Sequence, residues 1–254
     1  MRPLSPFFMA GMLMLSTPAT LLADAPWPAP LQALVDQGLE VHGQFDAPGG
    51  LQGFAASHRG REMAVYLTAD GEHAVVGTLL DAEGNDLSAA PLDTFVRSGQ
   101  EAAVWQTLES SHWIQDGDPQ APRVIYTFTD PNCPYCEQLY AQSRPWVEAG
   151  LVQLRHIMVG ILRDDSPAKA AALLGADAPA EALAAHQASD SGIAGSAQPR
   201  EIETQVYVNN QRFDSLGLMA TPTSYYRNDD GRLEKVEGAP DPARLETLMG
   251  SPRP

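Results

Sequence analysis

The only two cysteines of this 254-residue chain lie in the stretch FTDPNCPYCEQLY, residues 128–140. Only Pro134 and Tyr135 separate Cys133 from Cys136. Two thiols at this spacing can close a structural disulfide, supply two ligands of a metal site, or exchange disulfides with another molecule. The surrounding sequence distinguishes these three kinds of chemistry.

A structural disulfide stabilises a fold by closing a loop of the unfolded chain, and the gain grows with the length of that loop. A bridge between Cys133 and Cys136 would close a ring of only four residues. Short, strained bridges are also easily reduced. Both arguments disfavour a purely structural bridge.

A structural zinc site needs four ligands, usually thiolates and imidazoles, and the sequence has no second cysteine pair. The histidines are scattered singly along the chain: His42, His58, His73, His112, His156 and His186. His156 lies in a predicted strand and could approach the cysteines in space. We predict no metal site.

A redox pair fits the placement of the cysteines. They follow the predicted strand RVIYTF and open a predicted helix, with Cys133 near the N-cap and Pro134 at the first helical position. The free N–H groups and partial positive charge of a helix N-terminus stabilise a thiolate, which lowers the pKa of Cys133 below about 8.5. Cys133 is therefore the predicted nucleophile, and the more shielded Cys136 the predicted resolving thiol. The only redox group required is the Cys133–Cys136 disulfide itself, with no cofactor.

Elements that would position this pair alternate along residues 113–254. After the strand RVIYTF and the cysteine helix come a strand (VQLRHIMVGI), three helices (SPAKAAALLGA, APAEALAAHQAS and REIETQVYVNNQRFDSLG), two strands (TPTSYYR and RLEKVEG) and a final helix (DPARLETLMG). This order predicts a thioredoxin-like α/β domain with a helical insert. We therefore predict that the whole chain is an α+β protein.

Residues 24–90 have a different pattern. One short amphipathic helix precedes four short runs rich in β-branched and aromatic residues, separated by turn signals such as DAPGG and ADGE. Such a small sheet has edge strands suited to self-association. Helix-like spacing follows, and we assign residues 91–112 to a linker helix.

Residues 1–23 have the layout of a secretory signal, with Arg2 followed by an apolar stretch from about Phe7 to Leu22. The stretch is interrupted by polar residues and is short for a membrane span. An uncleaved anchor is the alternative to cleavage, which we place after Ala23. Export brings the cysteines into an oxidising compartment. The 32 acidic against 16 basic residues disfavour nucleic acid as a partner.

The cysteine stretch resembles the active-site segment of the DsbC and DsbG group of periplasmic disulfide isomerases, with Pro134–Tyr135 as in its DsbG branch. The resemblance is not confined to this stretch and extends over essentially the whole mature chain, with further similar segments at FDAPGG, YLTADGEHAVVG, SHWIQDG, RPWVEAGLVQLR, ILRDDSPAKAAA and ATPTSYY. The resemblance implies a cystatin-like dimerisation domain and a V-shaped homodimer. It also implies that Thr221 and a cis Pro222 face the cysteines and bind substrate peptide by β-addition.

The resemblance further implies a periplasmic thiol–disulfide oxidoreductase that isomerises or reduces wrong disulfides in protein substrates. Reduction of sulfenic acids on lone cysteines and re-reduction by the membrane reductase DsbD belong to the same expectation. We expect Pro134 and Tyr135 to tune the redox reactivity of the cysteine pair. Tyr135 would cover the sulfur, and the alternative is that it is only an exposed aromatic residue. Two other activities stay open: a dithiol oxidase of the DsbA kind, and a holdase chaperone that uses the dimer cleft.

Two positions depart from the expected pattern. Thr127 stands where thioredoxin has a buried aspartate, so the proton of Cys136 needs another acceptor, for which Asp130, Glu137 and water are candidates. Asn132 stands before the nucleophile, where the DsbG branch is expected to have a larger, apolar residue.

Overall fold

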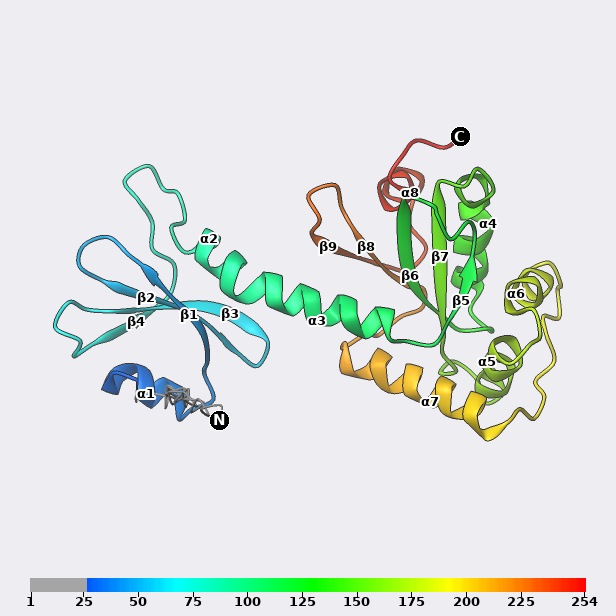
Figure 1. The fold of residues 1–254 in the computed structure, drawn as a ribbon, viewed down its shortest axis with the longest axis horizontal. Coiled ribbons are helices and arrows are strands. Elements are labelled where there is room, and N and C mark those ends of the chain that lie inside the picture. The colour runs from blue at the N-terminus through cyan, green and yellow to red at the C-terminus, as the bar shows by residue number, and fades with distance from the viewer. Residues whose placement is uncertain (1–26) are drawn as a thin grey trace, which may run out of the picture. The chain divides into compact units, whose positions relative to one another are not determined.

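The computed structural model describes residues 27–254, so the predicted signal peptide and its cleavage site lie outside the described residues. The chain divides into two compact units between Ser88 and Ala89 (Figure 1). Within residues 27–254, no helix combines the length and the apolar character needed to cross a bilayer.

The first unit is one helix followed by a four-stranded antiparallel meander, as the sequence predicts. Its elements are α1 (Ala29–Val35), β1 (Glu40–Asp46), β2 (Gln52–His58), β3 (Arg61–Leu67) and β4 (Ala74–Val76). The core forms because Leu31 of α1 packs with buried Phe54 of β2 and Val65 of β3. The strand order β1-β2-β3-β4 leaves β1 and the short β4 at the edges of the sheet.

The second unit begins with a helical stretch from Ala89 to Glu109. It consists of α2 (Ala89–Leu92), one π-helical turn η1 (Asp93–Arg97) and α3 (Ser98–Glu109). The helix continues through Gly99 despite the low helix propensity of glycine. Arg232 bonds to Glu101 at 2.7 Å and also to Asp93, which fixes this stretch to the second unit.

A five-stranded sheet forms the centre of the second unit. Its strands are β5 (Trp113–Asp116), β6 (Arg123–Thr129), β7 (Val152–Met158), β8 (Thr223–Arg227) and β9 (Leu233–Glu237), in the order β5-β7-β6-β8-β9. Strands β6 and β7 are parallel and the other pairs are antiparallel. Strand β5 is absent from the predicted elements, because this four-residue edge strand is specified by its pairing with β7 rather than by its own pattern.

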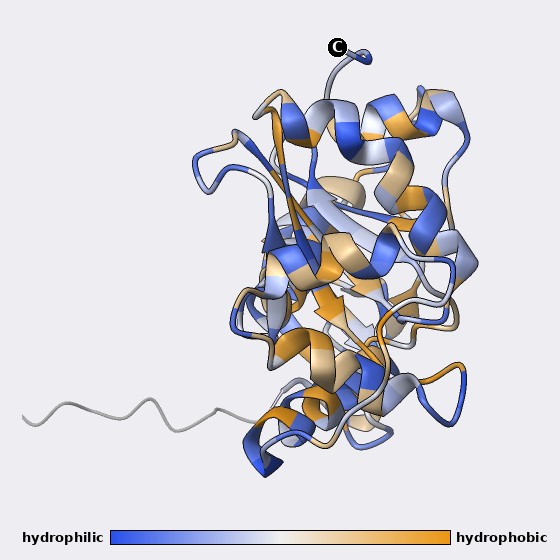
Figure 2. Cartoon of the chain, turned by 90° about the vertical axis from the view of Figure 1, so that its right-hand side faces the viewer, coloured by the Kyte–Doolittle hydropathy of each residue, from blue (hydrophilic) through white to orange (hydrophobic). Residues whose placement is uncertain are grey.

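Helices cover both faces of this sheet because its central strands alternate side chains between the two faces. Ile125 and Leu154 pack with Trp146 of α4 (Pro134–Glu148), whereas Phe128 packs with Phe213 of α7 (Arg200–Ser215) on the other face. The remaining helices are α5 (Ser166–Leu174), α6 (Pro179–Gln187) and α8 (Pro242–Met249). Figure 2 shows apolar residues concentrated in the central strands, with hydrophilic residues on outer helix faces and loops.

Helices α5, α6 and α7 form one excursion between β7 and β8, which is the predicted helical insert. Asp241 caps α8 by accepting a hydrogen bond from the Arg244 N–H at 3.0 Å, and Gly250 ends that helix with φ +80°. Both signals were readable in the sequence, because short-range capping depends only on neighbouring residues.

Candidate active site

Cys133 lies at the junction of β6 and α4. It is the N-cap of α4, with an extended backbone (φ −92°, ψ 113°), and Pro134 follows at the start of the helix. Cys136 lies one turn later on the buried side of α4. Both cysteines are free thiols, and Cys133 retains only 5 % of its exposed surface.

The environment of Cys133 favours the thiolate. The Cys136 thiol donates a hydrogen bond to it, and Thr221 and the backbone N–H groups of Tyr135 and Cys136 add to this stabilisation. Together they outweigh burial and lower the pKa of Cys133 to about 6. Cys133 is therefore mostly a thiolate at neutral pH, the form that attacks disulfides.

Cys136 has the opposite tendency. Burial raises its pKa well above the ordinary value, and the neighbouring Cys133 raises it further. The backbone N–H of Asp130 opposes this only in part. Cys136 thus holds its proton while Cys133 is ionised, so the two thiols are chemically distinct.

The loop before β8 brings Thr221 and Pro222 to the nucleophile. The Cys133 sulfur lies 3.1 Å from the Thr221 carbonyl oxygen, to which only the protonated form of the thiol can donate. The Thr221–Pro222 peptide bond is cis. This proximity arises because β6 and β8 are neighbours, with Phe128 opposite Thr223, so the loop entering β8 meets the segment leaving β6. Met219, in the same loop, is 90 % exposed.

Pro134 and Tyr135 lie between the two thiols on the first turn of α4. Pro134 occupies the first helical position, where a missing N–H leaves no hydrogen bond unmade. The Tyr135 side chain is 61 % exposed, and the contribution of this residue to the thiolate comes from its backbone N–H.

The carboxylate of Asp130 is buried and fully engaged. It accepts hydrogen bonds from the N–H groups of Ile161 (2.8 Å), Leu162 (3.0 Å) and Asn132 (2.8 Å), and from the Ser166 hydroxyl (2.9 Å). Asp130 thus anchors the turn before Cys133 to the loop after β7. The other carboxylate considered as a proton acceptor, Glu137, is exposed on α4.

Asn132 is tied to the start of α5. Its side-chain amide donates to Asp165 (2.9 Å) and Ser166 (2.8 Å), and its carbonyl oxygen accepts from Lys169 (2.8 Å). A polar residue at this position could not be explained from the sequence, because its partners lie more than 30 residues away along the chain. The structure shows that Asn132 joins the active-site turn to the helical insert.

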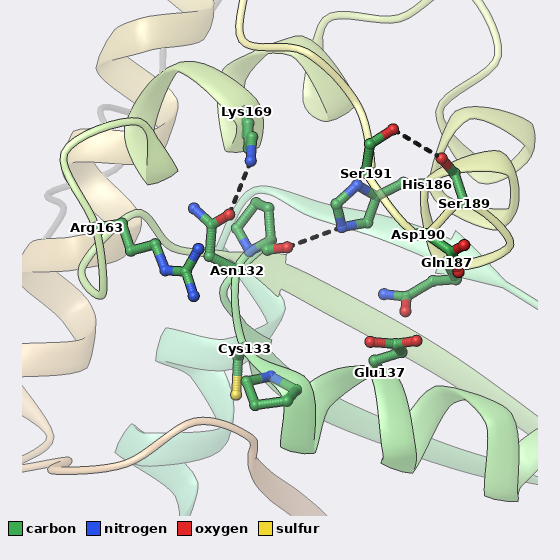
Figure 3. A pocket seen from close by; sticks show the side chains of 13 residues that line it. Asn132, Cys133, Glu137, Arg163, Lys169, His186, Gln187, Ser189, Asp190 and Ser191 are labelled. Carbon is green, nitrogen blue, oxygen red and sulfur yellow. Dashed lines mark hydrogen bonds between the residues drawn. The ribbon is translucent and has the colours of Figure 1, made fainter.

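A polar pocket of about 290 Å³ opens beside Asn132 and Cys133 (Figure 3). Its walls come from the active-site turn, the first turn of α4 and the helical insert, and they carry four charged side chains: Glu137, Arg163, Lys169 and Asp190. Within residues 27–254, no group of three or more His, Cys, Asp or Glu side chains is arranged to hold a metal ion.

His156 does not contact the cysteines. It lies between Thr129 and Asp116 at 3.3 Å from each, under α4. Burial would raise the pKa of Asp116, but hydrogen bonds from His156 and Arg144 outweigh it and lower that pKa to about 2. Thr127, in place of the buried aspartate of thioredoxin, accepts a hydrogen bond from the Ser224 hydroxyl at 3.1 Å.

Comparison with known proteins places the chain in a family. The family model described as a thioredoxin-like domain matches residues 117–251. The chain is 46 % identical over 228 residues to the thiol:disulfide interchange protein DsbG of Pseudomonas aeruginosa, covering 88 % of each chain. It is 36 % identical over 243 residues to DsbG of Escherichia coli, covering 94 % of this chain and 98 % of that protein.

Among solved structures, the catalytic domain of Proteus mirabilis ScsC superposes with a TM-score of 0.50 at 18 % identity. The match covers 59 % of this chain and 94 % of that domain, and it concerns the fold alone. Together with the family model, it confirms the predicted thioredoxin-like fold with mixed α/β content.

Proposed function

The chain belongs to the DsbG family of thiol:disulfide interchange proteins, and from this premise we propose that Cys133 and Cys136 are the catalytic pair of the oxidoreductase. One observation carries the assignment: two thiols on one helical turn, of which Cys133 has its pKa lowered to about 6 and Cys136 has its pKa raised. This asymmetry separates an attacking thiolate from a protonated resolving thiol.

In the proposed reaction, the Cys133 thiolate attacks one sulfur of a substrate disulfide. A Cys133–substrate disulfide forms, the substrate S–S bond breaks, and the second substrate sulfur leaves as a thiolate. Cys136 then transfers its proton to water, attacks the Cys133 sulfur and releases the first substrate sulfur as a thiolate, which leaves the Cys133–Cys136 disulfide. In isomerisation, the departing substrate thiolate attacks another disulfide of the same protein before Cys136 acts, and this attack releases a different substrate thiolate. That thiolate attacks the substrate sulfur of the Cys133–substrate disulfide, which forms a new substrate disulfide and releases Cys133 as a thiolate.

Thr221 and Pro222 are the proposed substrate-binding residues. The Thr221 carbonyl oxygen, 3.1 Å from the Cys133 sulfur, supports this role, because a backbone group at that distance can pair with an extended peptide that presents its sulfur to Cys133. Pro134 and Tyr135 are the proposed tuning residues. For Tyr135 the support is its backbone N–H, while its exposed ring is free to contact substrate.

Sulfenic acids on lone cysteines are a second proposed substrate. The Cys133 thiolate attacks the sulfenic sulfur, the S–O bond breaks, and hydroxide leaves and takes up a proton to form water. The mixed disulfide is then resolved by Cys136 as above. Each turnover oxidises the pair, so an external donor of two electrons is needed, for which we propose the membrane reductase DsbD.

The proposed location of the protein is the periplasm, with its signal peptide cleaved after Ala23. The proposed architecture assigns residues 24–90 to a homodimerisation domain, 91–112 to a linker helix and 113–254 to the catalytic domain. Supporting features are the edge strands of the first unit and the change from the first unit to the helical stretch at Ala89. The proposed substrates are proteins with wrong disulfides or oxidised cysteines.

A trapping experiment tests the catalytic assignment. The Cys136→Ala variant, expressed from the full chain, should accumulate mixed disulfides through Cys133 in periplasmic extracts, because the resolving step is removed. The double variant Cys133→Ala/Cys136→Ala is the control and should trap nothing. An equal yield from both variants would sink the assignment.

The redox state of the pair in growing cells tests the direction of the reaction. We expect Cys133 and Cys136 to be mostly reduced, and to become oxidised when the membrane reductase is deleted. A pair that is mostly oxidised in both strains would instead identify a dithiol oxidase. Alkylation of free thiols followed by gel electrophoresis distinguishes these states.

A further inference from the structure

The imidazole of His186 joins two segments that are far apart in the sequence. Its Nε2 lies 2.9 Å from the carbonyl oxygen of Pro131, two residues before the nucleophile. Its Nδ1 accepts a hydrogen bond from the backbone N–H of Ile193 at 2.8 Å. The bond to Pro131 is drawn as a dashed line in Figure 3.

These two partners fix the tautomer of His186. The Ile193 N–H can only donate, so Nδ1 must carry a lone pair, and the Pro131 carbonyl can only accept, so Nε2 must carry the proton. Both bonds are made by the neutral ring. Burial lowers the pKa of His186, as does Lys169, whereas the Pro131 carbonyl and Glu137 act in the opposite direction. The neutral form therefore prevails at neutral pH.

Gly192 allows the chain to pack closely against this ring. Its backbone has φ +63°, and a Cβ at this position would lie 2.7 Å from Cε1 of His186 and 2.8 Å from Nδ1. A larger residue would displace the ring or the loop. The His186 ring and its two hydrogen bonds are thus part of a tightly packed arrangement rather than an incidental surface contact.

The turn held by His186 delivers the nucleophile. The Cys133 N–H donates to the Asp130 carbonyl oxygen at 3.1 Å, which closes a four-residue turn over Asp130, Pro131, Asn132 and Cys133. The side chains of Asp130 and Asn132 are bound to the loop after β7 and to the start of α5. Pro131 has no N–H, so its carbonyl is its only backbone hydrogen-bonding group, and His186 of α6 holds it.

We propose that His186 is a positioning residue for thiol–disulfide exchange, which holds the Pro131 turn so that the Cys133 sulfur stays within reach of the groups that stabilise its thiolate. This inference rests on the proposed role of Cys133. His186 acts through the turn rather than by contact with the reacting sulfur. Asn132 and His186 both line the pocket beside Cys133, but Asn132 is the neighbour of Cys133 in the chain, so a substitution at His186 disturbs the nucleophile less directly.

The test compares His186→Phe with His186→Gln in the full chain. Phenylalanine fills the space of the ring and loses both hydrogen bonds, whereas glutamine can still donate to Pro131 and accept from Ile193. We expect His186→Phe to raise the pKa of Cys133 by about half a unit or more, about the worth of one neutral hydrogen bond. The equilibrium constant of the pair with glutathione should shift about threefold or more, while His186→Gln should stay close to wild type.

The measurements are the ultraviolet absorbance of the thiolate against pH and the redox equilibrium with glutathione. Neither depends on how a protein substrate binds in the pocket. His112→Phe, a half-buried histidine of the same unit, is the matched control and should leave both values unchanged. His186→Leu is a second variant without hydrogen bonds, in case the phenylalanine ring unfolds the insert.

A folded His186→Phe or His186→Leu variant with the wild-type pKa and equilibrium constant would overturn the proposal, even if its Tm is lower. An equal change in His186→Gln would also overturn it, because the hydrogen bonds would then not be the cause. If wild-type Cys133 itself titrates as an ordinary thiol and the Cys136→Ala variant traps nothing, the proposed function fails instead. The two failures are therefore distinguishable.

Discussion

Cys136 keeps its own proton and thereby helps Cys133 to lose one. The hydrogen bond from the Cys136 thiol is the largest cause of the low pKa of Cys133, and burial is the largest cause of the raised pKa of Cys136. Each thiol thus sets the ionisation state of the other. The predicted helix N-terminus contributes through the N–H groups of Tyr135 and Cys136, but it is not the main cause.

Removing the Cys136 thiol should therefore make Cys133 a poorer thiolate. We expect the pKa of Cys133 to rise from about 6 toward the ordinary value of about 8.5 in the Cys136→Ala variant. Cys136→Ser keeps a hydrogen-bond donor and should give an intermediate value. The rate of alkylation of Cys133 against pH measures both, and an unchanged pKa in Cys136→Ala would contradict this account.

The low pKa of Cys133 also makes the stability of the reduced protein depend on pH. The folded-state pKa lies below the unfolded value, so the ionised thiol stabilises the fold above about pH 8.5, and this contribution is lost as pH falls through about 6. The free energy of unfolding should rise between these limits by at most about 1.4 kcal/mol per pH unit.

Urea unfolding at several pH values measures this slope. The Cys133→Ala variant should lack it, and so should the oxidised protein, in which Cys133 has no titratable thiol. A slope of the same size in Cys133→Ala would assign the pH dependence to other groups.

Strand β5 and helix α4 are held together by an ion pair that is largely, but not fully, buried. The Asp116 carboxylate of β5 bonds to the Arg144 guanidinium of α4 and lies 3.3 Å from His156 of β7, and the Asp116 side chain is only 12 % exposed. The Arg144 guanidinium also stacks on the Tyr140 ring, 3.8 Å from its centroid. These contacts fix α4 on the sheet and thus the position of both cysteines.

Loss of one member of this ion pair should be strongly destabilising. We expect Arg144→Met to lower the free energy of unfolding by about 3 kcal/mol, because the largely buried Asp116 carboxylate loses one of its two partners and keeps only His156. The double variant Asp116→Asn/Arg144→Met should cost less than the sum of the two single variants. Urea unfolding of the wild type, the two single variants and the double variant gives a double-mutant cycle. Strictly additive changes in the free energy of unfolding would show that Asp116 and Arg144 are not coupled.

Most elements could be predicted from the sequence because periodicity and capping are local. The helix beginning at Pro134 and the cap Asp241 are examples. Strand β5 could not be predicted, because four residues at a sheet edge take their structure from β7. The roles of Asn132 and His186 were equally hidden, since each depends on partners brought close only by the tertiary fold.

Each unit of the molecule has its own core, and the hydrogen bonds that act on Cys133 come from residues of the second unit. The first unit offers a small sheet with edge strands. This division separates the reactivity of the thiol, which belongs to the second unit, from the proposed self-association, which belongs to the first.

A fragment that begins at Ala89 should therefore keep the chemistry and lose the association. We expect its Cys133 to titrate at about 6, as in the full chain, because none of the groups that lower this pKa is removed. Analytical ultracentrifugation should show a monomer for the fragment and a dimer for the full chain. A monomeric full chain would remove the proposed homodimer, whereas a raised pKa in a folded fragment would contradict the independence of the second unit.

The hydrogen bonds that the Asp130 carboxylate accepts from Ile161, Leu162 and Ser166 have a consequence for protein engineering. The helical excursion between β7 and β8 is an insert, which invites its exchange between relatives to alter the choice of protein substrate. Yet the backbone that leads into the nucleophile is fastened to that excursion. Replacing the helical excursion without the matching Asp130–Asn132 segment would change the reduction potential of the cysteine pair as well as the choice of protein substrate. The two segments should therefore be transplanted together.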